Sequence, residues 1–207
     1  MSLFESIKQA KCNQVPWVYH TLSGALSDKQ IQEIKMASFD KSGHIHNGKR
    51  SGNDDSNHHY REYITKENAD SYPQLTQLIR DLQSLPIRRA IAELTGQEDC
   101  FRDSYVRLEI LHDKKGFWLE KHQDIPEKLI SSLIYINDTN EDTNLGTDLY
   151  DEAGNLICTV PFHHNFGYIF AGPKKLHGME KDKVIKVERR GIQLNYVTFK
   201  TDWPVDP

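Results

Sequence analysis

Residues 105–111 read Tyr105-Val106-Arg107-Leu108-Glu109-Ile110-Leu111, and apolar and polar side chains alternate along this stretch. Side chains two apart on a strand share a face, so the alternation predicts a β-strand with two unlike faces. Further segments of strand character follow, and turn signals such as Lys115-Gly116 and Gly172-Pro173 separate them. We expect these strands over residues 117–122, 129–136, 148–150, 156–162, 167–170, 183–187 and 192–199.

The first half of the chain has helical rather than strand character, apart from a short strand expected at 17–19. Ser27 or Asp28 can cap a helix that runs to Lys35. Pro73 opens a second helix with apolar residues at helical spacing, and a third follows Pro86 and ends at Gly96.

Short strands preceded by helices predict a mainly β fold with N-terminal helices (α+β). We expect a double-stranded β-helix, or jelly roll, with the helices as a buttress on one sheet. One domain should span residues 1–207, with the buttress at about 27–96 and the jelly-roll core at about 100–200.

The composition excludes several classes of protein. The 207 residues carry a formal net charge of −4, which argues against general binding to nucleic acid. No apolar run reaches the roughly 18 residues that a membrane span needs, and no secretory signal is visible. Three cysteines, an odd number and far apart, argue against a disulfide framework. We therefore expect a cytoplasmic protein, and nothing in the sequence specifies an oligomeric state.

A candidate metal site begins with His122-Gln123-Asp124 at the end of a predicted strand. The imidazole and the carboxylate are two residues apart, so they can converge on one metal ion. A third ligand must come from elsewhere, and His177 is the candidate because it follows an apolar strand and a Gly-Pro turn. Two histidines and one carboxylate form a facial triad that leaves three positions open on Fe(II).

The order of segments around this triad is distinctive. Gly116 precedes His122 by six residues, and Arg189 follows His177 by twelve. Between the histidines lie three apolar segments with tyrosines, at 133–137, 145–150 and 166–170. This order resembles the Fe(II)- and 2-oxoglutarate-dependent dioxygenases, in particular the branch that includes prolyl hydroxylases. The resemblance covers roughly residues 100 to 200.

The resemblance implies a role for each matching residue. His122, Asp124 and His177 match the iron ligands of the family. Arg189 matches the arginine that pairs with the far carboxylate of 2-oxoglutarate, and Tyr135 matches a tyrosine that donates a hydrogen bond to the same group. The implied cofactor is Fe(II), with 2-oxoglutarate and O₂ as co-substrates and ascorbate as an auxiliary reductant. The implied reaction is hydroxylation of a substrate with release of succinate and CO₂.

Arg190 competes with Arg189 for the carboxylate, because neighbours on a strand face opposite ways. Arg189 shares a face with Gly191, Gln193 and Asn195, a small and polar set suited to lining a site. Arg190 shares its face with apolar residues that suit packing. We therefore expect Arg189 to point inward, with Arg190 as the alternative. By the same alternation, Trp118 and Glu120 should share the face of His122 and line the substrate cavity.

Other functions remain open at this stage. One alternative is a cupin-type metal-dependent isomerase or lyase, which needs no inward arginine; another is a non-catalytic β-sandwich binding module. A nucleic-acid demethylase of the same family is disfavoured by the acidic balance. The polar segment 41–57 is either a solvated loop or a lid over the substrate. The substrate itself is unidentified; the size of the chain favours a small molecule or an exposed group on a larger one.

Overall fold

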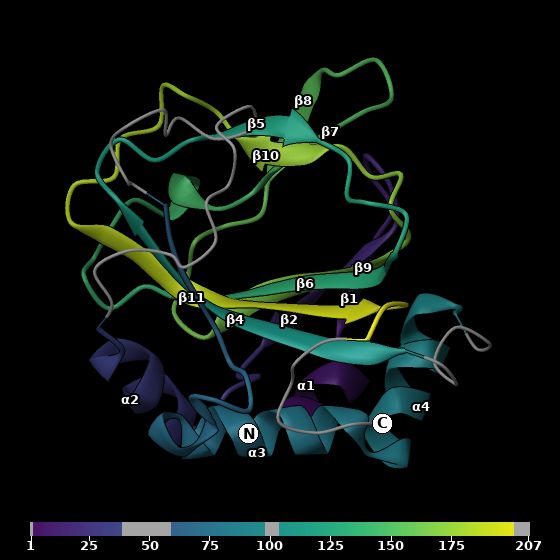
Figure 1. Ribbon diagram of the computed structural model, residues 1–207. Coiled ribbons are helices and arrows are strands. Elements are labelled where there is room, and N and C mark those ends of the chain that lie inside the picture. Colours follow the sequence, from purple (N-terminus) through teal and green to yellow (C-terminus); the bar gives the residue numbers. More distant parts are fainter. Residues whose placement is uncertain (1, 39–58, 98–103, 201–207) are drawn as a thin grey trace.

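Two antiparallel β-sheets face each other, and the helices pack against the outer face of the larger sheet (Figure 1). This computed structural model describes residues 2–38, 59–97 and 104–200. The predicted mainly β fold with N-terminal helices, a jelly roll with a helical buttress, is confirmed. The segment 41–57 lies outside the described residues.

The larger sheet has seven strands in the order β1-β2-β9-β6-β11-β4-β3. Their bounds are β1 Lys11–Asn13, β2 Tyr19–Ser23, β3 His59–Tyr63, β4 Tyr105–Lys114, β6 Lys128–Ile136, β9 Phe166–Ala171 and β11 Glu188–Val197. The smaller sheet has the order β5-β10-β7-β8, with β5 Leu119–His122, β7 Asp148–Tyr150, β8 Leu156–Thr159 and β10 His177–Met179.

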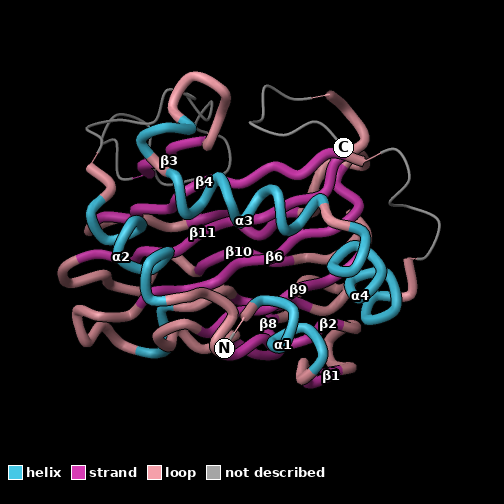
Figure 2. Tube along the Cα trace, turned by 90° about the horizontal axis from the view of Figure 1, so that it is seen from below, coloured by secondary structure: helices cyan, strands magenta, loops and turns pink. Residues whose placement is uncertain are grey.

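The helices lie side by side across one face of the larger sheet (Figure 2). They are α1 Leu3–Lys8, α2 Asp28–Met36, α3 Pro73–Gln83 and α4 Leu85–Thr95, with short 3₁₀ turns at Ala69–Ser71 and Thr143–Leu145. Ser27 and Gln30 form a reciprocal capping box at the start of α2. Gly96 ends α4 in the left-handed conformation at φ 72°, which glycine adopts without a steric penalty.

The alternation in the sequence sorts the side chains of the larger sheet into two layers. On β4 and β11 the even-numbered residues Leu108, Ile110, Ile192 and Leu194 join an aliphatic core beneath the helices. The odd-numbered residues face the smaller sheet, where an aromatic core contains Tyr135, Phe162, Tyr168 and Phe170. The space between the sheets is therefore the one place where polar residues of β4 and β11 can meet those of the smaller sheet.

Two expected strands are wrong. The strand expected at 17–19 begins only at Tyr19, as β2, because Trp17 lies against the aromatic core and its indole N–H donates to the carbonyl of Tyr150 (3.2 Å). Residues 183–187 form no strand. The carboxylate of Glu141 accepts the backbone N–H groups of residues 186–188, so these donors need no partner strand.

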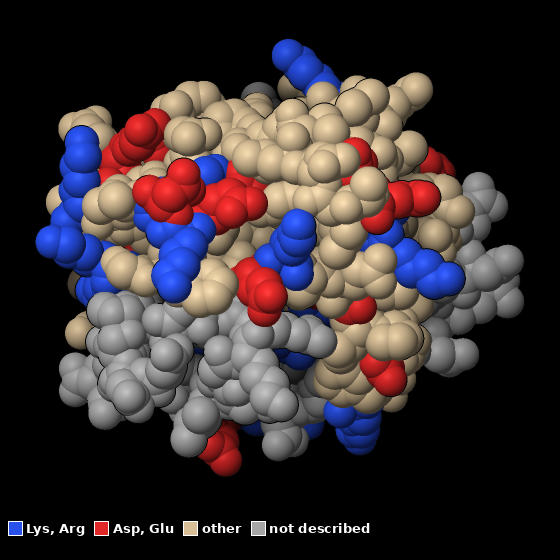
Figure 3. Space-filling model, turned by 90° about the horizontal axis from the view of Figure 1, so that it is seen from above, with Lys and Arg blue, Asp and Glu red and all other residues tan. Residues whose placement is uncertain are grey.

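No helix in the described part of the chain is both long and apolar enough to cross a membrane. On the face above the smaller sheet, basic side chains are interspersed with acidic ones (Figure 3).

Candidate active site

The three residues predicted as metal ligands lie together between the sheets. His122 ends β5 and His177 begins β10, and the two residues pair directly across the antiparallel ladder. Their ring centroids are 4.5 Å apart, and Oδ2 of Asp124 lies 4.0 Å from Nε2 of His177. One candidate ligand atom from each residue lies within 4.8 Å of the others. This geometry could hold a single metal ion.

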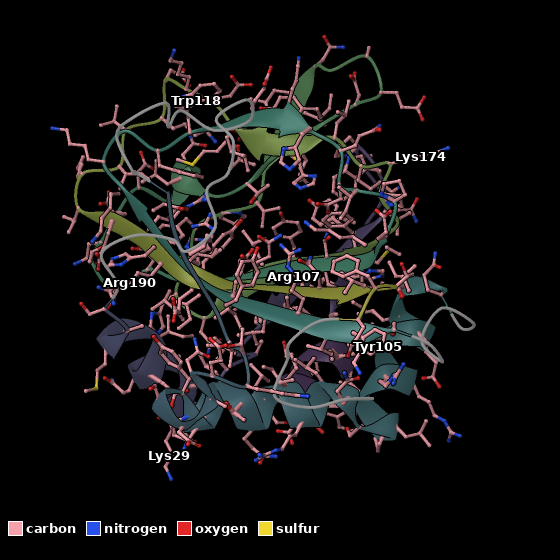
Figure 4. All side chains as sticks on the ribbon, viewed as in Figure 1. Lys29, Tyr105, Arg107, Trp118, Lys174 and Arg190 are labelled. Atoms are coloured by element: carbon pink, nitrogen blue, oxygen red, sulfur yellow. The ribbon has the colours of Figure 1, made fainter. Side chains whose placement is uncertain are left out.

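The close approach of β10 to β5 depends on Gly178. A Cβ atom at this position would lie 2.7 Å from the carbonyl oxygen of Leu119. The pairing of the two strands also shifts register just after His177. Because of this irregularity Leu119 lines the cavity, whereas Trp118 and Glu120 do not, so the prediction for those two residues is wrong. Trp118 lies at the outer edge of the smaller sheet (Figure 4), where it contacts the ammonium of Lys181.

Both histidines are held in the tautomer that leaves Nε2 able to bind a metal ion. Nδ1 of His122 donates a hydrogen bond to the carbonyl of Glu120, and Nδ1 of His177 donates to the carbonyl of Lys175, each at 2.8 Å. Since a carbonyl oxygen only accepts, each Nδ1 carries the proton and each Nε2 keeps its lone pair. Burial and the neighbouring His177 lower the pKa of His122 to about 4, and burial lowers the pKa of His177. Both rings are therefore neutral at pH 7.

Asp124 is buried, and its carboxylate is fixed by two donors. Nζ of Lys128 donates to Oδ1 (2.5 Å), and Oγ of Ser131 donates to Oδ2 (2.6 Å). The Ser131 hydroxyl in turn accepts from Nδ2 of Asn195 on β11 (3.1 Å). Burial alone would raise the pKa of Asp124, but the charge of Lys128 and these hydrogen bonds outweigh it, and the pKa is lowered. The carboxylate is therefore ionised, and a donor holds each of its two oxygens.

The triad opens into a cavity of about 270 Å³ between the two sheets. Its wall includes the triad itself, Leu133 and Tyr168 from the β6 and β9 side, Arg189 and Gln193 from β11, and Arg61, Arg107 and Glu109 from the β3 and β4 side. In Figure 4, Arg107 lies on the face of the larger sheet that looks toward the smaller one. The cavity wall is thus strongly polar on its larger-sheet side.

Arg189 points into this cavity, as the alternation predicted, and only 3% of it is exposed. Its Nε and Nη2 donate to Oδ2 of Asp113 (2.8 and 2.6 Å), and its Nη1 donates to the carbonyl of Leu145 (2.8 Å). A guanidinium has five N–H groups, so one remains on each of Nη1 and Nη2. Asp113 also accepts from Nη1 of Arg61 (2.7 Å). Two buried guanidiniums therefore share one carboxylate.

Arg190 faces the helical layer instead (Figure 4). Its Nη1 donates to the carbonyls of Ile34 and Lys35 at the end of α2, and its Nε donates to Glu188 (2.5 Å). Unsatisfied carbonyls at a helix C-terminus are natural partners for a guanidinium. Arg190 thus ties α2 to the sheet.

Tyr135 lies just behind the cavity wall rather than in it. Its hydroxyl is 2.5 Å from Oγ1 of Thr147 and accepts from the Thr147 backbone N–H (3.0 Å), and its ring lies 5.9 Å from the guanidinium carbon of Arg189. Tyr168, which sequence reasoning missed, lines the cavity itself. Its buried hydroxyl lies near Thr147 but makes no hydrogen bond of normal geometry there. The inward face of the strand at 167–170 was the available signal, because a buried tyrosine hydroxyl usually has a polar partner.

Solved structures of other proteins share this architecture. A prolyl 4-hydroxylase from Pseudomonas putida matches with a TM-score of 0.64 and 12% identity, covering 96% of this chain and 100% of that one. A Trichoplax adhaerens prolyl hydroxylase, solved with a peptide fragment of the hypoxia inducible factor oxygen degradation domain, matches at 0.60 and 13%, covering 87% and 83%. HygX from Streptomyces hygroscopicus, solved with nickel and 2-oxoglutarate, matches at 0.57 and 10%, covering 89% and 85%.

These likenesses define the fold as the prolyl-hydroxylase-like form of the 2-oxoglutarate oxygenase fold. No protein-family model and no curated protein sequence matches the chain. At identities this low the likeness concerns the fold, and the chemistry has to be argued from the residues of the cavity.

Proposed function

We propose that this protein is an Fe(II)- and 2-oxoglutarate-dependent dioxygenase that hydroxylates its substrate. One observation carries the proposal: His122, Asp124 and His177 present one ligand atom each within 4.8 Å, in a cavity that also receives the guanidinium of Arg189. The two imidazoles and one carboxylate fit Fe(II) and leave positions for further ligands.

Arg189 is suited to hold the far carboxylate of 2-oxoglutarate. Its two remaining N–H groups form a planar fork, which matches a carboxylate in a bidentate contact. Arg189 and Arg61 both donate to Asp113, and this one carboxylate balances only one of the two positive charges. A carboxylate at this place would supply that balance.

In the proposal Tyr168 lines this end of the cavity, and Tyr135 supports it from behind the wall. Tyr135 sets the position of Thr147, whose hydroxyl lies at the cavity wall, and stands beside Arg189. The hydroxyl of Tyr168 is a donor without a partner of its own and can bind the co-substrate directly. Burial raises its pKa well above the usual value, so it keeps its proton.

The chemistry that a bound Fe(II) supplies is the coupled oxidation of 2-oxoglutarate and substrate by O₂, in which one oxygen atom enters succinate, the other enters a substrate C–H bond, and CO₂ leaves. The protein contributes orientation and exclusion of water. The aromatic core around Phe162, Tyr168 and Phe170 closes the cavity on the β9 side.

Neither alternative has a specific observation in its favour. A cupin-type isomerase would have no use for the buried guanidinium pair, and a passive binding module would have no use for two histidines held with Nε2 toward a carboxylate.

The test is iron-dependent turnover. Purified protein should bind one Fe(II) per chain and convert 2-oxoglutarate to succinate, slowly without substrate. Asp124→Ala should lose both the metal and the turnover, because it removes a ligand, whereas Asp182→Ala, at an exposed position outside the cavity, should keep both. Failure of the unmodified protein to bind Fe(II), or full turnover by Asp124→Ala, would refute the proposal.

A further inference from the structure

The cavity floor has a second half that the proposed reaction leaves unused. The strand order β9-β6-β11-β4-β3 places β11 in the middle. The co-substrate residues lie on β11 and toward β9, whereas Arg107 and Glu109 lie on β4, on the other side. Glu109 pairs directly with Gln193, and Arg107 pairs with Asn195. This half adjoins the triad side of the cavity through the Asn195–Ser131 hydrogen bond.

Glu109 is a buried carboxylate with an open acceptor. Only 3% of the residue is exposed, and its Oε2 atom has no hydrogen-bond partner. Among the described residues, no basic nitrogen forms an ion pair with it within 4.0 Å. A buried carboxylate oxygen without a partner is costly, and such groups in native proteins usually await water, an ion or a ligand. Glu109 also lines the cavity, so its side chain lies beside whatever binds there.

Glu109 is nevertheless ionised. Burial alone would raise its pKa, but positive charges close by outweigh burial, and the pKa is lowered. The charges belong to Arg107, Arg61 and Lys128. An ionised carboxylate with a free oxygen selects a donor, and a protonated amine satisfies it best.

Arg107 offers the complementary group two residues away on the same strand face. Its Nη2 donates to the hydroxyl of Tyr63 (2.7 Å), which anchors one edge of the guanidinium, while its buried Nε has no partner. Residues two apart on a strand are roughly 7 Å apart along the backbone, so their flexible side chains can reach two groups on one small molecule. A guanidinium selects a carboxylate.

The charge balance of the whole cavity favours a ligand with both signs over a polycation. Of the residues that the structure describes, four basic side chains line it: Arg61, Arg107, Lys128 and Arg189. Three carboxylates lie among them: Glu109, Asp113 and Asp124. The excess is one positive charge, and Fe(II) together with the dianion 2-oxoglutarate leaves it unchanged. A substrate with several positive charges would be repelled.

We propose that Glu109 and Arg107 form the substrate head-group site and that the substrate is a small molecule with a free α-amino acid head group. Its ammonium donates to Oε2 of Glu109, and its carboxylate accepts from Arg107. This inference rests on the proposed function, because it places the substrate beside the co-substrate.

The test measures binding as well as turnover. Protein loaded with nickel, a redox-inert substitute, and with 2-oxoglutarate is titrated by calorimetry with a panel of free L-amino acids. Each amino acid is compared with its N-acetyl and its amide derivative, which remove the ammonium and the carboxylate in turn. At least one free amino acid should bind and should stimulate succinate formation with Fe(II). Either blocking group should weaken the binding of that amino acid by about 10- to 100-fold.

A substitution of Glu109 tests whether this residue binds the ammonium of the substrate. Glu109→Gln should bind 2-oxoglutarate normally, which shows that it is folded, but should lose most of its preference for the free amine over the N-acetyl form. Glu152→Gln makes the same change at an exposed position outside the cavity and should retain the preference.

The outcomes separate the two proposals. If nickel and 2-oxoglutarate bind but no free amino acid does, or if the blocked derivatives bind equally well, the head-group site is wrong while the dioxygenase proposal stands. Tighter binding of a doubly blocked, peptide-like derivative also overturns the head-group site. If 2-oxoglutarate itself does not bind, the proposed function fails.

Discussion

Replacing Arg189 by methionine should weaken 2-oxoglutarate binding by about 100-fold. The change removes the two N–H groups left after Arg189 has bonded to Asp113 and Leu145. Hydrogen bonds between charged groups contribute about 1.5–3 kcal/mol each. A loss of about 3 kcal/mol corresponds to about 100-fold in the dissociation constant, since each 1.4 kcal/mol is tenfold. Methionine has similar length and no charge, and Asp113 keeps its contact with Arg61.

Arg190→Met is the matched control, because it makes the same substitution one residue along the same strand. Arg190 lies on the helical face and bonds to Glu188 and to two carbonyls at the end of α2. Its loss should destabilise the protein by about 1–2 kcal/mol, measured by urea unfolding, and should leave 2-oxoglutarate affinity unchanged.

Calorimetric titration of 2-oxoglutarate into nickel-loaded protein compares the two variants directly. Unchanged affinity in Arg189→Met would refute the proposal that the Arg189 guanidinium binds the far carboxylate of 2-oxoglutarate. Weakened affinity in Arg190→Met alone would show that Arg190, and not Arg189, binds this carboxylate.

Three further results should follow. Tyr168→Phe should leave the stability of the ligand-free protein unchanged, since the hydroxyl has no hydrogen-bond partner, but should weaken the binding of 2-oxoglutarate about 5-fold, measured by calorimetry. Equal affinity would show that Tyr168 does not bind the co-substrate. Gly167→Ala should destabilise the fold by about 3 kcal/mol in urea unfolding, because a Cβ would lie 1.9 Å from the carbonyl oxygen of Leu133; a neutral result would mean that β6 and β9 can separate freely. Burial would raise the pKa of Glu188, but its hydrogen bond with His112 outweighs burial, and the pKa falls to about 2. The ionised Glu188 should therefore stabilise the fold above about pH 4.5 and lose this effect toward pH 2. The difference in Tm between wild type and Glu188→Gln should shrink across that range, and a constant difference would contradict this.

Local sequence patterns predicted much of the fold. The period-two alternation at 105–111 and at 189–196 set which residues face the helices and which face the cavity, because a strand has only two faces. The capping residue Ser27 and the glycine at 96 marked helix ends for reasons confined to a few residues. The spacing of His122 and Asp124 allowed the two to be proposed as ligands of one metal ion, and the order of the surrounding segments supported that proposal.

Other features depended on partners distant along the chain. His177 meets His122 only because β10 pairs with β5, and the register shift in that pairing is what kept Trp118 and Glu120 out of the cavity. Residues 183–187 have the composition of a strand, but they form none, and the carboxylate of Glu141 accepts hydrogen bonds from the backbone N–H groups at the end of this segment.

The sequence by itself determined the alternating faces of the strands, the helix ends and the spacing of His122 and Asp124, because each follows from residues that are close along the chain. Only the tertiary structure decided what shares the cavity: the Asp113 carboxylate between two guanidiniums, the unpartnered hydroxyl of Tyr168, and the open oxygen of Glu109. Burial and hydrogen-bond satisfaction are properties of the assembled sheets, and no spacing along one strand can specify them.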